Sequence, residues 1–177
     1  MHRALTATLT TVLMTGVLLA LALGNEHLLS ATEVAAGVNW IYLPAGLRMC
    51  YALVLPVQGT LAIFTATLLL AARDPSLTGL LVVENAAITA AGPILARTVA
   101  IQHLGLKPDL SNLNTRMLLM LAALFGFFGT ALHQAFFASI GRESAFVSMW
   151  IGDTLGCLLF LYALKGITLL WGRWTVR

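Results

Sequence analysis

Four charged residues lie inside hydrophobic stretches long enough to cross a membrane: Arg48, Glu84, Arg97 and Asp153. A charge at the centre of a bilayer costs about 3 kcal/mol on insertion scales. Charges kept at such positions usually pair with one another, line a cavity or carry out chemistry. These residues therefore indicate a polar site in the interior of a membrane protein.

Two arrangements of these charges remain open. Arg48 can form a structural ion pair with Asp153 or with Glu84 that only stabilises the helix packing. Alternatively, one cation and two carboxylates can line a pocket. One carboxylate is then left without a cationic partner, which favours either its protonation or a cationic ligand.

Other polar residues fall at a similar depth, if each helix rises about 1.5 Å per residue. Glu84 and Asp153 lie about 10 Å below the outer surface, and His133 is slightly shallower. Arg97 and Lys165 fall near the inner surface, where their side chains can reach the headgroups. The predicted ligand-binding residues come from four helices and are Asn39, Trp40, Arg48, Glu84, Asn85, His133, Gln134, Trp150 and Asp153.

The composition predicts one integral membrane domain covering residues 1–177. The chain is 59% hydrophobic and 10% charged, with a mean hydropathy of +0.91, whereas soluble domains carry roughly 25% charged residues. Most of its surface must therefore contact the lipid bilayer. Its ten Lys and Arg residues are scattered, so the net charge of +3 does not indicate a nucleic-acid partner.

The hydrophobic stretches predict an all-α bundle of about six transmembrane helices. The first stretch follows Met-His-Arg, and its Ala20-Leu21-Ala22 resembles a signal-peptide cleavage site. About 20 apolar residues exceed the usual signal-peptide core, so we expect a retained helix. The interruption at Pro44 and Gly46 predicts a kinked or partly re-entrant segment. The predicted helices are approximately 4–23, 38–55, 57–72, 78–103, 116–137 and 146–170.

The distribution of basic residues predicts that both termini are cytoplasmic. Six spans place the two termini on one side of the membrane. The opposite loops keep only Arg73 and Arg142, each beside an acid, as the positive-inside rule requires. The predicted location is a bacterial cytoplasmic membrane. The expected cytoplasmic basic residues and the C-terminal interfacial anchor comprise Arg3, Lys107, Arg116, Trp171, Arg173, Trp174 and Arg177.

No catalytic, metal or cofactor motif is recognisable. The four histidines are too dispersed for metal-ligand spacing. There is no nucleophile elbow, phosphate-binding loop or His-Glu-x-x-His motif. Cys50 and Cys157 lie in apolar segments without Cys-x-x-Cys spacing, which predicts buried free thiols. We therefore expect a protein that is not an enzyme and that uses no cofactor or metal.

Two short motifs resemble a known family. Leu43-Pro44-Ala45-Gly46-Leu47-Arg48 precedes a pair of short apolar helices, and Trp150-Ile151-Gly152-Asp153-Thr154-Leu155-Gly156 begins the last helix. This order resembles the first-described type of the membrane-associated sensor (MASE) family of bacterial signalling proteins. The similarity runs from about Asn39 to Lys165. Its motif positions here are Pro44, Gly46, Trp150, Gly152, Asp153 and Gly156.

The resemblance implies an all-helical sensory module, a type usually fused to a histidine kinase or a cyclic-dinucleotide enzyme. This chain departs from the family in having about six spans instead of about eight, and in ending after the last helix. Any output would then belong to a separate partner protein. From the residues alone, Gly152 and Gly156 form a Gly-x-x-x-Gly pattern, whose usual role is close packing between helices.

Three functions follow from these observations. The first is a non-enzymatic sensory or small-ligand-binding module that takes its ligand from the outer side and acts through a partner. The second is a substrate-binding subunit similar to the S components of vitamin transporters. The third is a structural accessory subunit, in which the buried charges serve packing alone.

Overall fold

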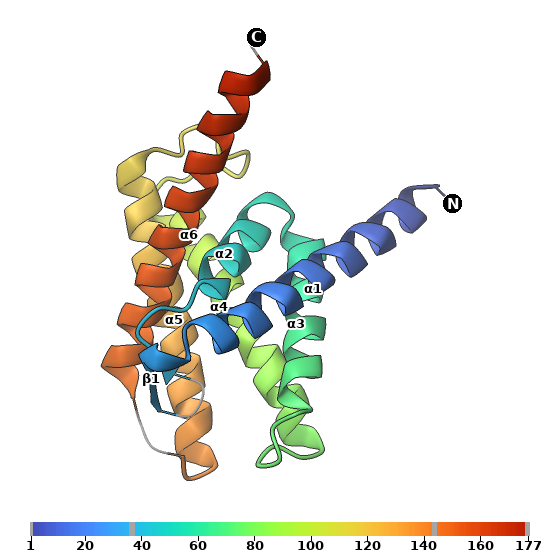
Figure 1. Cartoon of the computed structure of the whole chain (residues 1–177), viewed down its shortest axis with the longest axis vertical. Coiled ribbons are helices and arrows are strands. Elements are labelled where there is room, and N and C mark those ends of the chain that lie inside the picture. Colours follow the sequence, from blue (N-terminus) through green and yellow to red (C-terminus); the bar gives the residue numbers. More distant parts are fainter. Residues whose placement is uncertain (1, 36–37, 143–144, 176–177) are drawn as a thin grey trace.

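The computed structural model describes residues 2–35, 38–142 and 145–175. Six α-helices and one short β-hairpin make up this part of the chain (Figure 1). The all-α prediction is confirmed. The elements are α1 (His2–Leu28), η1 (Ser30–Thr32), β1 (Glu33–Ala35), β2 (Val38–Asn39), α2 (Pro44–Val54), α3 (Pro56–Ala71), α4 (Leu80–His103), α5 (Thr115–Ser139) and α6 (Phe146–Thr175).

Four of the helices are long and apolar enough to cross a membrane: α1, α4, α5 and the Phe146–Lys165 part of α6. The other two are shorter. At 1.5 Å per residue, α2 with 11 residues and α3 with 16 residues are about 16 and 24 Å long, less than the roughly 30 Å of a hydrocarbon core. The predicted bundle of about six helices is confirmed, with four helices long and apolar enough to cross a membrane and a pair of shorter ones.

The helices alternate in direction, so both chain ends lie on one side of the bundle. Figure 1 shows the two termini and the loop 104–114 at the top, and the loop 72–79 and residues 140–142 at the bottom. We call these the terminal side and the loop side. The predicted placement of both termini on one side of the membrane agrees with this arrangement.

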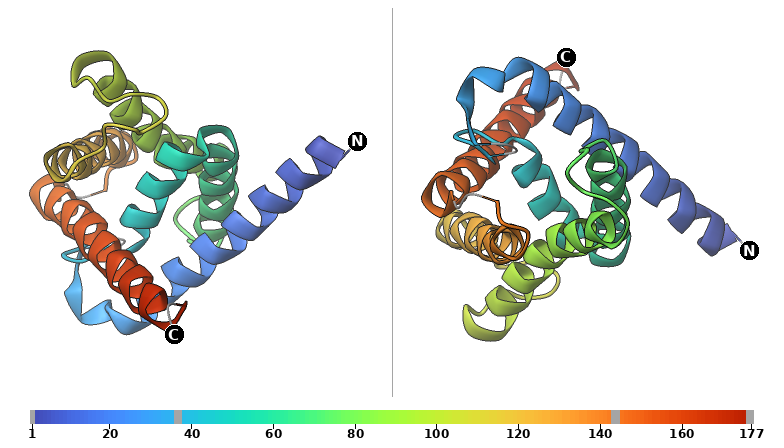
Figure 2. Two further views of the ribbon diagram at one scale, coloured as in Figure 1. Left: turned by 90° about the horizontal axis from the view of Figure 1, so that it is seen from above. Right: turned by 90° about the horizontal axis from the view of Figure 1, so that it is seen from below.

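The short helix α2 occupies the centre of the bundle. It packs against each of the other helices, and views along the bundle show them arranged around it (Figure 2). It begins in the interior, where Pro44 at its first turn is buried and where Leu43 N–H donates to Asn25 Oδ1 at 3.0 Å. Glycine permits a close contact between its Gly46 and Phe160 of α6. The predicted re-entrant segment is thus a half-helix enclosed by protein.

The predicted helix over residues 38–55 is wrong in its first part. Val38 and Asn39 form strand β2, which pairs antiparallel with β1, and the helix begins only at Pro44. Proline fixes its own φ and lacks an N–H, so it suits the first turn of a helix and not its interior. The residues before Pro44 instead run as an extended segment against α6.

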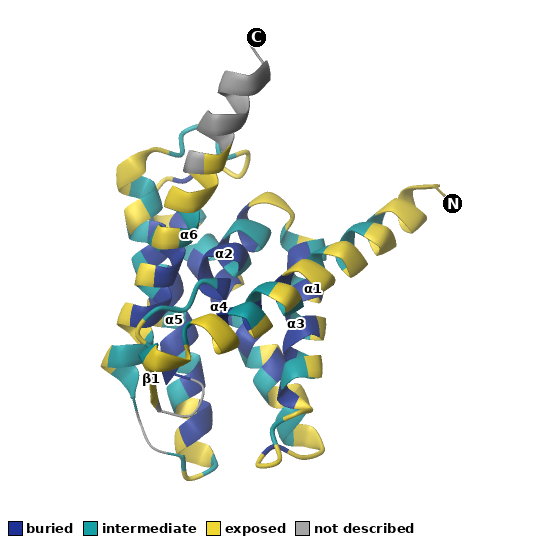
Figure 3. Cartoon of the chain, in the orientation of Figure 1, coloured by how far each residue is buried: buried dark blue, intermediate teal, exposed yellow. Residues whose placement is uncertain are grey.

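The helix α1 continues past its predicted end at residue 23 and reaches Leu28. Its inner face is buried around Leu18 and Ala22, and Tyr51 O–H donates to the carbonyl of Met14 at 3.0 Å. This longer helix includes Glu26, an exposed residue in the cavity lining, where the sequence predicted a loop. Buried residues gather at the centre and the outward faces are exposed (Figure 3), the pattern expected where those faces contact lipid.

Candidate ligand-binding site

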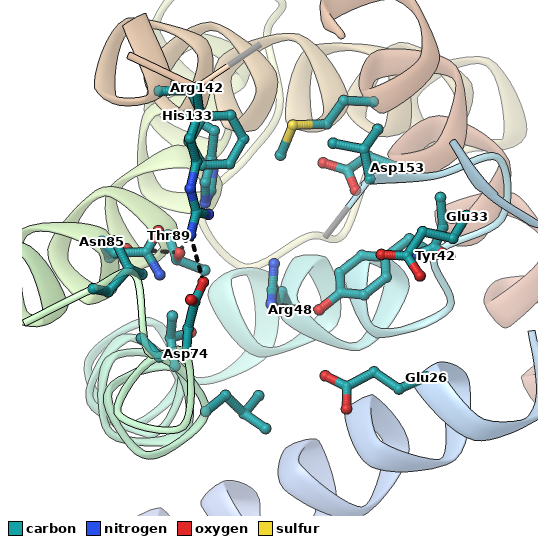
Figure 4. Close-up of a pocket in the computed structure, with 18 of the residues that line it drawn as sticks. Glu26, Glu33, Tyr42, Arg48, Asp74, Asn85, Thr89, His133, Arg142 and Asp153 are labelled. Atoms are coloured by element: carbon teal, nitrogen blue, oxygen red, sulfur yellow. Dashed lines mark hydrogen bonds and ion pairs between the residues drawn. The ribbon is translucent and has the colours of Figure 1, made fainter. Parts of the chain in front are cut away.

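A cavity of about 470 Å³ occupies the loop-side half of the bundle. The cavity extends from Asp74 and Arg142, in the loops of the loop side, to Arg48 on α2 in the interior (Figure 4). All six helices contribute to it. The volume falls within the 300–1,000 Å³ typical of small-molecule sites. Its charged lining residues are Glu26, Glu33, Arg48, Asp74, Arg142 and Asp153.

Arg48 has few partners for its donor groups. Its Nη2 donates to the Tyr42 hydroxyl at 2.8 Å, and its guanidinium carbon lies 5.0 Å from the centroid of the Tyr42 ring. The buried Nε atom has no hydrogen-bond partner among the described residues. A guanidinium carries five N–H donors, so most of the hydrogen-bonding capacity of Arg48 is unused by the described part of the chain.

Asp153 is buried, with an exposed fraction of 6%, and it lines the cavity. Its carboxylate accepts no hydrogen bond and joins no ion pair within the part of the chain that the structure describes. The ion pair recorded there joins Arg142 and Asp74. The structural ion pair of Arg48 with Asp153 or Glu84, one of the two arrangements that the sequence left open, is therefore not formed among the described residues.

Two glycines hold the backbone that positions Asp153 and Tyr42. A Cβ atom at Gly152 would collide with the carbonyl oxygen of Asn39, and one at Gly156 would collide with that of Tyr42. Tyr42 N–H also donates to the carbonyl of Gly152 at 3.3 Å. The Gly-x-x-x-Gly pattern was predicted to pack two helices, but it packs α6 against the extended segment 39–42. A side chain at either glycine would push Tyr42 away from Arg48.

His133 is buried beside a hydroxyl and a carbonyl. Its Nδ1 lies 2.8 Å from the carbonyl of Gly129, and its Nε2 lies 3.0 Å from Thr89 Oγ1. A carbonyl only accepts, so Nδ1 carries a proton in this arrangement. The Thr89 hydroxyl also lies 2.8 Å from the carbonyl of Asn85. Since it has one proton, it can donate to Asn85 or to a neutral His133, but not to both.

A cluster of polar residues closes the loop-side end of the cavity. Arg142 Nη2 lies 2.6 Å from Asp74 Oδ2 and also contacts the Ser76 hydroxyl. Ser76 N–H and O–H donate to the other oxygen of Asp74 at 2.9 and 2.6 Å. The hydrogen bonds from Ser76 and Arg142 lower the pKa of Asp74 from 3.8 to about 2. This pair joins the loops that follow α3 and α5.

The structure brings together part of the predicted site. Arg48, Asn39, Asn85, His133 and Asp153 line the cavity.

Four predicted residues lie outside the lining. Glu84 is exposed on the outer face of α4. Gln134 accepts from Ala145 N–H at 3.1 Å, and Trp150 Nε1 donates to the carbonyl of Ala123 at 3.0 Å. Trp40 is 43% exposed. The structure therefore places these four outside the cavity lining. For the three in helices, a depth estimate gives the position along the helix but not around it.

Eight polar lining residues were not predicted from the sequence, namely Glu26, Ser30, Glu33, Tyr42, Thr67, Asp74, Thr89 and Arg142. Thr89 had a usable signal, because it lies four residues after Asn85 and so on the same helical face. Tyr42 and Glu26 had none, since their positions depend on the extended segment and on the added turn of α1.

Comparisons with protein-family models, with curated proteins and with solved structures found no match to this chain. The resemblance to the MASE family therefore stays a prediction.

Proposed function

We propose that this protein is a non-enzymatic integral membrane module that binds a small polar ligand in the cavity and acts through a separate partner protein. The observation that carries the proposal is the pair of charged groups in the cavity wall. Asp153 is 6% exposed, and its carboxylate accepts no hydrogen bond from the described residues. The Nε atom of Arg48 is buried and has no hydrogen-bond partner among the described residues. Charged groups inside a membrane protein are costly unless a partner satisfies them.

A purely structural role explains these two groups less well. Breaking a buried pair leaves an uncompensated charge, so a structural pair is stable only with close, well-formed contacts. The Arg142–Asp74 pair has such contacts, with additional hydrogen bonds from Ser76. Arg48 and Asp153 lack them and share a cavity instead. A ligand that satisfies both groups accounts for this difference.

The proposal also assigns a membrane orientation. With the terminal side in the cytoplasm, as the basic residues predict, the cavity lies in the outer half of a bacterial cytoplasmic membrane. A ligand from outside would reach it, and a partner would contact the terminal side. The bundle would exist in two helix packings. A ligand that binds one packing more tightly would shift the equilibrium toward it, by an amount set by the difference between the two affinities.

The test is an unbiased search for a ligand. The wild-type protein in lipid nanodiscs would be incubated with a metabolite extract of its native host, washed, and the retained small molecules identified by mass spectrometry. We expect at least one molecule that Asp153→Asn no longer retains. Glu84→Gln is the matched control, because it neutralises an exposed carboxylate outside the cavity, and it should retain that molecule. Identical retention by all three proteins, or none by any, would contradict the proposal.

A transport subunit is a second candidate, and α2 is the observation that favours it. Transporters often place their binding sites beside helices that are interrupted near the middle of the membrane, and α2 begins in the interior beside the cavity. Co-purification from the native host separates the candidates. An ATPase with a coupling protein would support transport, and a kinase or a cyclic-dinucleotide enzyme would support sensing.

A further inference from the structure

We infer that the ligand of this cavity is a small zwitterion, a molecule that carries both a protonated amine and a carboxylate or phosphate. The inference rests on the proposed ligand-binding function and specifies its chemical class. It follows from two opposite charges that line one cavity and form no ion pair with the described residues, together with the balance of the charges around them.

The Asp153 carboxylate requires a donor. It offers two oxygens with about four acceptor positions, and no described residue donates to either oxygen, although the side chain is 94% buried (6% exposed). An ammonium group supplies up to three N–H donors and the opposite charge. Gly129 permits the carboxylate to lie close to α5, since a Cβ atom there would be only 3.3 Å from Asp153 Oδ2.

The Arg48 guanidinium requires an acceptor. Its one recorded hydrogen bond goes to the Tyr42 hydroxyl. Stacking on the Tyr42 ring holds the guanidinium in the cavity wall, and Figure 4 shows its tip directed into the space that Asp153 also faces. A planar guanidinium matches the geometry of a carboxylate or a phosphate. The ligand therefore needs an anionic group as well as the amine.

The balance of charge argues against a ligand of a single sign. The Arg142–Asp74 ion pair carries no net charge as a unit. Arg48 is then accompanied in the cavity lining by Asp153 and the exposed Glu26, so a simple anion would meet net repulsion. A simple cation would leave the guanidinium of Arg48 without an acceptor. A zwitterion satisfies both groups.

Two sources can supply this chemistry. One is a free amino-acid-like metabolite, for which a cavity of about 470 Å³ leaves space for several bound waters. The other is the phosphoethanolamine headgroup of a lipid, with its ammonium and phosphate. Both present the same pair of charges, so the experiment must separate them.

The test uses a series of defined probes: the ω-amino acids from glycine to 5-aminopentanoate, and the alkylamine and alkanoate of each matching length. Binding to the wild-type protein in nanodiscs without phosphatidylethanolamine is measured by isothermal titration calorimetry. We expect one ω-amino acid to bind at least about tenfold more tightly than either single-charge analogue. Its length then measures the separation of Arg48 and Asp153 across the ligand.

Two variants test the assignment of each end. Asp153→Asn should weaken binding of that ω-amino acid about 10- to 100-fold while leaving alkanoate binding unchanged or stronger. Arg48→Gln should weaken it by a similar factor and spare the alkylamine. The matched controls are Glu84→Gln and Arg97→Gln. Glu84 is exposed outside the cavity, and Arg97 is directed to the terminal side, where its Nη2 lies 3.5 Å from the carbonyl of Pro108. Both control variants should bind the ω-amino acid like the wild type, which would show that a change of charge alone does not unfold the protein.

The lipid source is tested separately. If phosphatidylethanolamine is retained in native mass spectra of the wild type and lost from both Asp153→Asn and Arg48→Gln, the zwitterion assignment holds and the ligand is a lipid headgroup. If the metabolite search finds a ligand and neither the probes nor the lipid binds as a zwitterion, the inference is overturned while the proposed function stands. If no search finds any ligand, both fall.

Discussion

The loop-side and terminal-side halves of the bundle are built from the same helices but have opposite interiors. The loop-side half contains the polar cavity. The terminal-side half is filled by a packed apolar cluster that includes Met49, Leu53, Leu121 and Phe125. The helix α2 contributes to both halves. Its Arg48 lines the cavity, and the next residue, Met49, is buried in the apolar cluster. Irregular backbone is tolerated at membrane depth where it is buried or lines a cavity. In the segment 39–42, Asn39 and Tyr42 line the cavity, and Tyr42 also packs against the apolar cluster.

The largest effect is expected where the segment 39–42 meets α6. A Cβ atom from Gly156→Ala would collide with the carbonyl of Tyr42, a backbone atom that cannot move without its segment. We expect a loss of about 3 kcal/mol or more of stability, measured by thermal unfolding in detergent. Gly16→Ala on α1 is the control, since it meets no atom within 4 Å and should change stability by less than about 1 kcal/mol. Equal melting temperatures for the two variants would show that the segment is not packed as described.

The apolar half is tested by removing buried volume. Leu121 is 1% exposed and Leu119, two residues earlier on the same helix, is 50% exposed. Leu121→Ala should cost about 2–5 kcal/mol through the lost contacts and the cavity left behind, and Leu119→Ala about 0.5 kcal/mol or less. The measurement is again thermal unfolding. Similar costs at both positions would mean that the terminal side lacks a tightly packed core.

The polar half should respond in the opposite direction. Replacing both cavity charges, with Arg48→Met and Asp153→Leu in one protein, removes a partly buried and a buried charge that form no ion pair with the described residues. Replacing buried charges by apolar residues is often neutral or stabilising by about 1–4 kcal/mol. We expect unchanged or higher stability together with complete loss of ligand binding. A clear loss of stability would instead assign the two charges a structural role.

The smallest effect is expected at the loop-side end of the cavity, where the Asp74–Arg142 pair is partly exposed. Its hydrogen bonds hold the pKa of Asp74 near 2, below the ordinary value of 3.8. A lowered pKa stabilises the folded state fully above pH 3.8, and this contribution is lost as the pH falls toward 2. Since the Asp74 side chain is 35% exposed, solvent screening limits the pair to about 0.2–1 kcal/mol.

Asp74→Asn should therefore lower the melting temperature slightly at pH 7 and make no difference near pH 2. Comparing the wild type and the variant at both values isolates this pair from the other carboxylates that titrate in the same range. A difference that persists at the lower pH would show that Asp74 contributes through packing or neutral hydrogen bonds and not through its charge.

The sequence by itself determined the class of the protein and the approximate positions of its helices. Apolar stretches of membrane length predicted both ends of α4 and α5 and the start of α6 to within a few residues. The proline at position 44 marked an interrupted segment. A helix in a membrane satisfies its backbone hydrogen bonds within itself, and its apolar side chains contact lipid directly. Each helix can therefore be predicted from its own stretch of sequence. The charges within the stretches correctly indicated a polar interior.

Only the tertiary structure decided which of those charges share a cavity. Glu84 and Asp153 are both carboxylates in membrane-length helices at a similar predicted depth. Glu84 is nevertheless exposed, whereas Asp153 is buried. In the sequence, only Asp153 is flanked by a Gly-x-x-x-Gly pattern, and that pattern predicts close packing without naming the partner. The rotation of a helix is set by the neighbours it packs against. For α6 those neighbours include the backbone of residues 39–42, more than 100 positions earlier in the chain. The site exists where that distant segment meets two glycines, and such a contact depends on the whole fold.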